Sequence, residues 1–459
     1  MPHSKLFPSD FLFGAATSSF QIEGHPLADG AGPSIWTEFT KQKDAILNGD
    51  HADLACNHYN LWEQDIELMK KLGLKTYRLS ISWPRVMPTG EGEVNEKGLD
   101  FYSRIVDKLI ESGIKPMVTL YHWDLPQALQ DKGGWTNPGI VEAFTEYSVT
   151  VNKALGDRVS MFATLNEPWV FMHLGMISGI HAPGIKDLGY AARAYKNILL
   201  ASSSAINAMR AVNPDHDLGV TCDFAHFDAA SDKPEDIRAR DILHDYHNNL
   251  FVEPWFKGTI PEAANTLFKP HGMTWSEEEL ASLVVPIDFL GVNYYRRTVA
   301  TAGKDDFLNA HALPAEGKVT EMDWQVYPDG LYNVLGWIYD TCKVPLYVTE
   351  NGSAYDYPVV DSRVEDVLRT EYLDTHLQAC ARAIRDGVDL RGYYAWSLLD
   401  NFEWERGYGK RFGMIHVDYE TLERTIKDSG YFYRDFIKEH AQVSMKPANG
   451  TAVNDKVAI

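Results

Sequence analysis

The stretch Met161-Phe162-Ala163-Thr164-Leu165-Asn166-Glu167-Pro168 joins an apolar run to a carboxylate and a proline. A short run that is apolar at nearly every position is typical of a parallel strand buried on both faces. Proline directly after the carboxylate indicates a turn. We therefore expect a buried strand, Val159–Leu165, that ends just before Glu167.

Seven further segments share this pattern, and helical patterns separate many of them. The other expected strands are Phe11–Ala16, Thr76–Ile81, Pro116–Tyr121, Leu218–Phe224, Phe289–Tyr294, Leu346–Thr349 and Gly392–Ser397. The clearest helices are expected over Asn60–Leu72, Phe101–Glu111 and Val364–Arg385, where apolar residues recur at helical spacing. Eight strands alternating with helices predict an α/β fold, a single (β/α)8 TIM barrel.

No linker or break in composition divides the chain, so one catalytic domain over residues 1–459 is expected. Two connections are long, approximately 25–56 and 296–329, and long loops after barrel strands would form the rim of a deep active-site pocket. The polar end of the chain, 444–459, is expected to be a flexible tail.

The composition argues against several classes of function. A net charge of −21 disfavours nucleic acid and anionic membranes and suits a neutral substrate, although it could serve solubility alone. The four cysteines form no CxxC pair, and no metal-ligand spacing or nucleotide-binding fingerprint is present, so no metal and no cofactor are expected. We find no signal peptide and no transmembrane run, which predicts a cytoplasmic protein.

Two glutamates follow expected strands: Glu167, and Glu350 after Leu346–Thr349. In a barrel the ends of these two strands open at the same mouth, where catalytic residues of this fold lie. Two facing carboxylates can cleave a glycosidic bond: one protonates the leaving oxygen while the other attacks the anomeric carbon or activates water. The alternative is two unrelated surface or salt-bridged glutamates.

A set of motifs decides between these alternatives. Asn166-Glu167-Pro168 and Thr349-Glu350-Asn351-Gly352 resemble the two signatures of glycoside hydrolase family 1, the β-glucosidase family, and the chain looks like a fungal intracellular-type member. The resemblance continues through 11–17 (FLFGAAT), 21–24 (QIEG), 77–85 (YRLSISWPR), 121–126 (YHWDLP), 293–295 (NYY) and 400–404 (DNFEW).

The resemblance implies a mechanism that retains the anomeric configuration, with Glu167 as general acid/base and Glu350 as nucleophile. Retention requires the two carboxyl groups to lie about 5–5.5 Å apart. Arg78 and Tyr295 match family residues that contact the nucleophile, and Asn293 is grouped with them as catalytic support. Taken alone, Arg78 could be an ordinary buried ion-pair residue and Tyr295 a core residue.

The resemblance also implies a sugar-binding pocket. The expected substrate-binding residues are Gln21, His122, Trp123, Asn166, Trp324, Trp396, Glu403, Trp404 and Phe412, and the candidates on the leaving-group side are Trp169 and Leu174. From local sequence alone, His122 could be a structural histidine and Trp396 a core residue. Glu403 carries a negative charge where the phospho-β-glycosidases of the family carry serine, so an unphosphorylated sugar is expected.

The expected function is that of a retaining exo-β-glucosidase. Its small-molecule substrates would be cellobiose, short cello-oligosaccharides and aryl β-glucosides, with β-galactosidase or β-fucosidase side activity and transglycosylation possible. An endo-β-glucanase on a related barrel and a catalytically inactive sugar-binding barrel are the alternatives. The sequence does not determine an oligomeric state.

Overall fold

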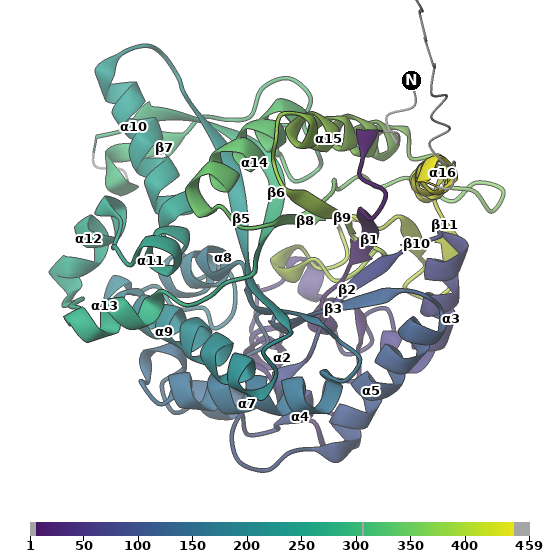
Figure 1. The fold of residues 1–459 in the computed structure, drawn as a ribbon, viewed down its shortest axis with the longest axis horizontal. Helices are drawn as coiled ribbons and strands as arrows, with labels where there is room; N and C mark the ends of the chain where they lie inside the picture. The colour runs from purple at the N-terminus through teal and green to yellow at the C-terminus, as the bar shows by residue number, and fades with distance from the viewer. Residues whose placement is uncertain (1–5, 305–306, 445–459) are drawn as a thin grey trace, which may run out of the picture.

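The computed structural model describes residues 6–304 and 307–444. Within them, eight parallel strands close into a barrel in the order β5-β4-β3-β2-β1-β9-β8-β6, and β6 pairs back with β5. The barrel strands are β1 (Leu12–Ala16), β2 (Thr76–Ser80), β3 (Lys115–Tyr121), β4 (Met161–Asn166), β5 (Asp217–Ala229), β6 (Phe289–Ala302), β8 (Leu346–Asn351) and β9 (Leu390–Trp396). The expected TIM barrel is confirmed (Figure 1).

Helices surround this barrel. A long helix follows most of the strands: α3 (His58–Lys71), α5 (Glu96–Glu111), α7 (Ile140–Leu155), α9 (Leu188–Val212), α14 (Pro328–Cys342), α15 (Val367–Arg385) and α16 (Asp428–Ser444). Shorter helices lie in the connections: α1 (Ser19–Ile22), α2 (Ile35–Phe39), α4 (Trp83–Val86), α6 (Gln127–Gln130), α8 (Pro168–Met172), α10 (Pro234–His244), α11 (Val252–Lys257), α12 (Glu262–Phe268) and α13 (Glu277–Leu283).

Both faces of the barrel sheet are buried, which explains why its strands are continuous apolar runs. Alternate side chains of one strand point to opposite faces. In β4, Phe162 belongs to the large cluster that also contains apolar residues of the surrounding helices, whereas its neighbours Met161 and Ala163 belong to a separate small cluster. Tyr347 in β8 joins this small cluster. The barrel therefore has a filled interior below the site that it carries.

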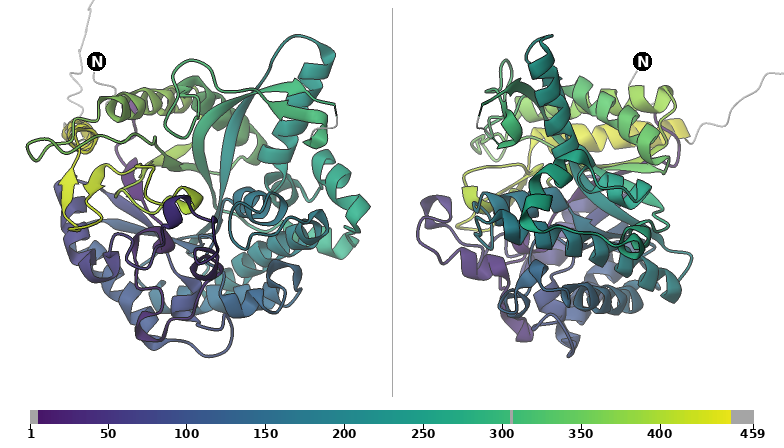
Figure 2. Two further views of the ribbon diagram at one scale, coloured as in Figure 1. Left: turned by 180° about the vertical axis from the view of Figure 1, so that it is seen from behind. Right: turned by 90° about the vertical axis from the view of Figure 1, so that its left-hand side faces the viewer.

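Two strands are longer than expected. β5 and β6 continue to Ala229 and Ala302, well past the predicted ends at Phe224 and Tyr294, and they remain paired along this extension. A short antiparallel strand, β7 (Ala310–Ala312), adds to the edge of β6. Figure 1 shows the extension running from the barrel toward α10, and Figure 2 shows it from two other sides. Part of the connection expected over 296–329 is therefore sheet.

Smaller differences concern the ends of elements. Glu350 lies within β8 and does not follow it, because the strand continues to Asn351. A two-stranded sheet of β10 (Ile415–Val417) and β11 (Arg424–Ile426) was not expected. Apart from Ser444, the expected tail lies outside the described residues, and the single domain over 1–459 stays a prediction.

Candidate active site

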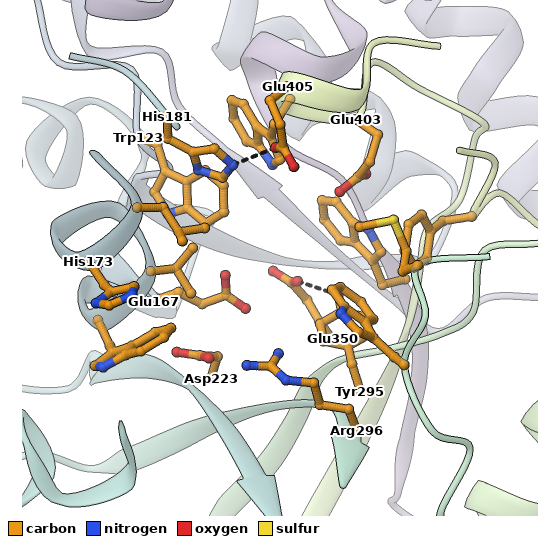
Figure 3. Close-up of a pocket in the computed structure, with 18 of the residues that line it drawn as sticks. Trp123, Glu167, His173, His181, Asp223, Tyr295, Arg296, Glu350, Glu403 and Glu405 are labelled. Carbon is orange, nitrogen blue, oxygen red and sulfur yellow. Dashed lines mark hydrogen bonds and ion pairs between the residues drawn. The ribbon is translucent and has the colours of Figure 1, made fainter. Parts of the chain in front are cut away.

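A cavity of about 340 Å³ opens where the carboxyl ends of the barrel strands meet. Its lining includes Glu167 directly after β4, Tyr295 in β6, Glu350 in β8 and Trp396 at the end of β9. In Figure 3 the carboxyl groups of Glu167 and Glu350 both point into this cavity. Both side chains are nearly inaccessible, with exposed fractions of 5% and 3%. They are not two unrelated surface glutamates.

Glu167 owes its position to an unusual backbone conformation. Its φ of 51° and ψ of 62° place it in the left-handed region between β4 and α8, and Pro168 occupies the first turn of that helix. Left-handed conformations are rare for residues other than glycine and concentrate at functional sites. The Glu167 amide donates to the carbonyl oxygen of Thr221 in β5 at 2.9 Å, and this hydrogen bond fixes the turn.

Glu350 is held by two strong donors. Arg78 Nη1 lies 2.6 Å from Glu350 Oε1, and the Tyr295 hydroxyl donates to Oε2 at 2.7 Å. Each carboxylate oxygen therefore has its own charge-assisted or hydroxyl partner, which orients the group and stabilises its ionised form. Arg78 and Tyr295 lie at the positions expected from the sequence.

A shared amide network joins the two glutamates. Asn293 Nδ2 donates to Glu167 Oε1 at 2.7 Å and to Asn166 Oδ1 at 3.1 Å. Arg78 Nη2 donates to the same Asn166 oxygen at 2.6 Å. Asn166, Arg78 and Asn293 thus connect Glu167, directly after β4, to Glu350 on β8 through buried side chains, which sets the relative orientation of the two carboxyl groups.

The surroundings of the two carboxyl groups differ. Burial raises the pKa of Glu167 well above its ordinary value, and the negative charges of Glu350 and Asp223 raise it further. Burial also raises the pKa of Glu350, but Arg78 and the Tyr295 hydroxyl oppose this rise. These surroundings favour a protonated Glu167 and an ionised Glu350.

The residues after Glu350 explain why the motif ends in Asn-Gly. Asn351 Nδ2 donates to the Tyr294 carbonyl oxygen at 2.6 Å, and Asn351 Oδ1 accepts from the Tyr393 hydroxyl at 2.8 Å. A Cβ at Gly352 would lie 1.7 Å from the carbonyl oxygen of Trp396, so only glycine allows this close approach of β8 to the end of β9.

His122 lines the cavity and carries a buried donor. Its Nε2 lies 3.1 Å from Asn166 Nδ2 and accepts from it, which leaves the proton on Nδ1. Nδ1 is buried and has no hydrogen-bond partner in the described part of the chain. Burial, together with the positive charge of Arg78, lowers the pKa of His122 well below its usual value, so the ring stays neutral.

Aromatic rings form much of the remaining wall. The Trp396 and His122 rings are stacked with centroids 5.8 Å apart, and the Trp123 and Trp404 rings lie 4.5 Å apart. Trp324 packs against Tyr295 at 5.2 Å. These rings cover the side of the cavity that a flat apolar sugar face can contact.

The two long connections differ in how they reach the cavity. The connection over 296–329 lines it directly through Met322 and Trp324. The connection over 25–56 acts through Trp36 in α2, whose ring lies 4.5 Å from that of Trp404.

The structure gathers the expected residues in one place. The cavity is lined by Glu167, Glu350, Tyr295, His122, Trp123, Trp324, Trp396, Glu403, Trp404, Phe412, Trp169 and Leu174. Arg78, Asn166 and Asn293 do not line it but hold the carboxyl groups from behind. Gln21 also lies behind it: its Nε2 donates to the Phe402 carbonyl oxygen at 2.8 Å and lies 3.5 Å from Glu403 Oε2.

Several lining residues were not expected, namely Val170, His173, His181, Asp223, Arg296, Met322 and Glu405. Asp223 could have been found, because it falls near the end of an expected strand, as Glu167 does. His181 and Glu405 form a pair at 2.7 Å across 224 positions of sequence, and neither lies in a motif that signals this contact.

Among residues 6–304 and 307–444, no cluster of three or more His, Cys, Asp or Glu side chains could hold a metal ion. Over the same residues, every helix is too short or too polar to cross a membrane.

The chain was then compared with known proteins. The sequence profile of Glycosyl hydrolase family 1 matches residues 3–442. Beta-glucosidase A of Thermotoga maritima is 46% identical over 439 residues, covering 95% of this chain and 98% of the relative. Beta-glucosidase A of Acetivibrio thermocellus is 44% identical, covering 95% and 98%. These relatives are bacterial, and the expected similarity to fungal members is not borne out.

Solved structures of a family 1 β-glucosidase are similar to this chain in three dimensions as well. The family 1 β-glucosidase of Thermotoga maritima superposes with a TM-score of 0.93 at 45% sequence identity, covering 95% of this chain and 99% of that one. A complex of the Thermotoga enzyme with glucoimidazole matches with a TM-score of 0.92. With the profile match over 3–442, this likeness places the chain in glycosyl hydrolase family 1.

Proposed function

We propose that this chain is a retaining exo-β-glucosidase that removes terminal non-reducing β-D-glucosyl residues from cellobiose, short cello-oligosaccharides and aryl β-glucosides. The observation that carries the proposal is the pair Glu167 and Glu350, which share one cavity but have unequal surroundings. The relatives named β-glucosidase, which align over nearly the whole chain, support the choice of substrate.

In the first step, an ionised Glu350 oxygen attacks the anomeric carbon and the bond to the leaving oxygen breaks. Glu167 donates its proton to that oxygen, so that the leaving group departs neutral. The positions of Arg78 and Tyr295 on the Glu350 carboxylate support this role, because they favour its charged form and aim it. We expect the carboxyl groups to lie about 5–5.5 Å apart.

In the second step, the charge of Glu350 is absent because the carboxylate has become an ester. One of the causes of the raised pKa of Glu167 then disappears, and Glu167 can ionise. The ionised Glu167 takes a proton from water, whose oxygen attacks the anomeric carbon and releases Glu350. A sugar hydroxyl in place of water would give transglycosylation.

The sugar would lie between the polar and aromatic walls of the cavity. His122, which lines the cavity, would contact a ring hydroxyl, and Asn166 would hold the His122 ring from behind through the hydrogen bond from its Nδ2 to His122 Nε2. Trp396 and Trp404 would contact the apolar face. This arrangement is also compatible with β-galactoside or β-fucoside side activity.

Negative charge in the cavity argues for an unphosphorylated sugar. Glu403 lines the cavity together with Glu405, and His181 is the partner of Glu405. Burial and the charges of Glu405 and Glu350 raise the pKa of Glu403, because this wall disfavours a further negative charge. We expect much lower kcat/KM for a 6-phospho-β-glucoside than for the parent glucoside.

The test is chemical rescue of Glu350→Gly. The variant should lose hydrolysis of aryl β-glucosides, and added azide should restore turnover with the α-glucosyl azide as product, because azide occupies the space of the missing carboxylate. A variant that retains full activity, or a β-configured azide product, would contradict the assigned role of Glu350. Product analysis on a long β-glucan separates exo action from the endo alternative.

A further inference from the structure

A second cavity, of about 470 Å³, lies beside the active site. Trp169, His173 and Arg296 line both cavities and form their common wall. The rest of the second lining comes from the extension of β5 and β6, from the end of α10 and the segment after it, from Phe307 and from β7. In Figure 3, His173 and Arg296 lie on the side of the active site away from His181 and Glu405.

A series of aromatic rings leads from the common wall into the second cavity. The Trp169 and His173 rings are stacked, with centroids 4.6 Å apart and 10° between their planes. His173 contacts Phe307 at 5.8 Å, and Phe307 contacts Tyr246 at 5.1 Å. The Tyr246 hydroxyl lies 2.7 Å from His173 Nδ1, which fixes both rings. The rings are thus held in place for a flat ligand to contact.

The chemistry of the second lining differs from that of the first. Five carboxylates line the active site, namely Glu167, Asp223, Glu350, Glu403 and Glu405. Among the described residues around the second cavity there is no carboxylate and no carboxamide. Carbohydrates are normally bound by such groups, which accept and donate paired hydrogen bonds to hydroxyls. Apart from Thr298 and Arg296, the lining consists of aromatic rings, histidines among them, and aliphatic side chains, so the second cavity suits an aromatic group better than another sugar.

Arg296, which lines both cavities, can also contact an aromatic ligand. The half-buried guanidinium lies 5.6 Å from the ring centroid of Trp324 and has no carboxylate partner in the described part of the chain. A guanidinium without such a partner can contact the face of an aromatic ligand. Arg296 lines both cavities, so it can contact a leaving group that reaches from the active site into the second cavity.

We propose that the second cavity binds the distal ring of an extended aryl leaving group, one with at least two aromatic rings joined end to end. This inference rests on the proposed β-glucosidase function and adds a substrate class to it. The proximal ring would lie at Trp169 and Arg296, and the distal ring would contact Phe307, Tyr246 and Leu243. The bond-breaking step is unchanged.

The test compares biphenyl-4-yl and phenyl β-glucoside, whose leaving phenols have similar acidity. The measured quantity is the aryl ratio, kcat/KM for the biphenylyl substrate divided by that for the phenyl substrate. We expect a ratio of at least about ten in the unmodified protein, since burying the second ring removes about 60–100 Å² of apolar surface from water. Phe307→Ala should lower the ratio about fivefold, and Leu243→Trp, which fills the cavity, should bring it close to one.

Tyr431→Ala is the matched control. Tyr431 lies on α16 and is 41% exposed, compared with 37% for Phe307, and it lines neither cavity. The control should keep the aryl ratio of the unmodified protein. The corresponding ratio for cellotriose over cellobiose, measured in the same variants, distinguishes an aromatic ligand from a sugar.

Three outcomes would overturn the inference: an aryl ratio near one in the unmodified protein, no change of the ratio in Phe307→Ala and Leu243→Trp, or a fall of the cellotriose ratio as large as that of the aryl ratio. Failure of the proposed function is a distinct result. In that case the unmodified protein would hydrolyse neither phenyl β-glucoside nor cellobiose.

Discussion

Tyr295→Phe should move the acid limb of the pH profile to higher pH. The substitution removes the hydroxyl that donates to Glu350 Oε2 at 2.7 Å and leaves the ring in place. Burial raises the pKa of Tyr295 well above its ordinary value, so the hydroxyl is a donor throughout the working range of pH. A hydrogen bond to the charged form of a carboxyl group lowers its pKa, and its loss raises the pKa of Glu350.

The magnitude follows from the type of bond. A buried hydrogen bond to a charged group contributes about 1.5–3 kcal/mol, and about 1.4 kcal/mol corresponds to one pKa unit. Arg78 remains on the other oxygen at 2.6 Å and limits the change. Glu350 must be ionised to attack. We therefore expect the acid limb of the pH profile of kcat/KM for an aryl β-glucoside to move to higher pH by about 1–2 units.

Tyr294→Phe provides the control for this prediction. Tyr294 precedes Tyr295 in β6, is fully buried, and donates to the carbonyl oxygen of Tyr327 at 2.8 Å, away from both glutamates. Its loss should affect stability and leave the acid limb in place. The reasoning would be refuted if Tyr295→Phe lowered kcat/KM by the same factor at every pH, or if Tyr294→Phe moved the limb equally.

Three further predictions concern charge and close packing. Asp223→Asn removes a charge that raises the pKa of Glu167, so the basic limb of the pH profile of kcat/KM should move to lower pH. The control is Asp228→Asn, also on β5, which should leave that limb unchanged. Asp400→Asn removes the buried negative charge that lies 2.7 Å from Lys427 and 2.9 Å from Arg411, and it should lower the free energy of unfolding by about 3 kcal/mol in thermal or denaturant unfolding. Its control is Asp356→Asn, an exposed partner of Arg411, which should lower the free energy of unfolding by less than about 1 kcal/mol. Gly352→Ala forces β8 away from Trp396 and should lower kcat/KM at least about tenfold, whereas Gly336→Ala in α14, with open space around its Cβ, should retain activity.

The barrel could be predicted because its strands are buried on both faces. Burial on both sides leaves continuous apolar runs such as Met161–Leu165, which stand out from amphipathic helices. Beyond the barrel the strands are no longer continuous apolar runs. The ends of β5 and β6 past Phe224 and Tyr294 carry half-buried, mixed side chains, so their pairing was not visible in the sequence.

In the site, too, only the residues that lie in a recognisable local pattern could be predicted from the sequence. Glu167 and Glu350 lie at or just after buried strands, and motifs around them identify their family. Asp223 lies on a barrel strand as well, but without a motif to single it out. Arg296 and His173 line the cavity from the extension of β6 and the turn after α8, and their neighbours in sequence give no sign of this.

The sequence by itself determined the barrel and the family and singled out Glu167 and Glu350 as candidates, because each of these inferences depends on local patterns of burial or on short motifs. The tertiary structure alone decided how those glutamates differ. Arg78 in β2 and Tyr295 in β6 both contact Glu350 in β8, whereas Glu167 receives Asn293 and the nearby charge of Asp223. The pKa of a buried carboxyl group depends on what closes around it in space, and those neighbours come from strands far apart in the chain.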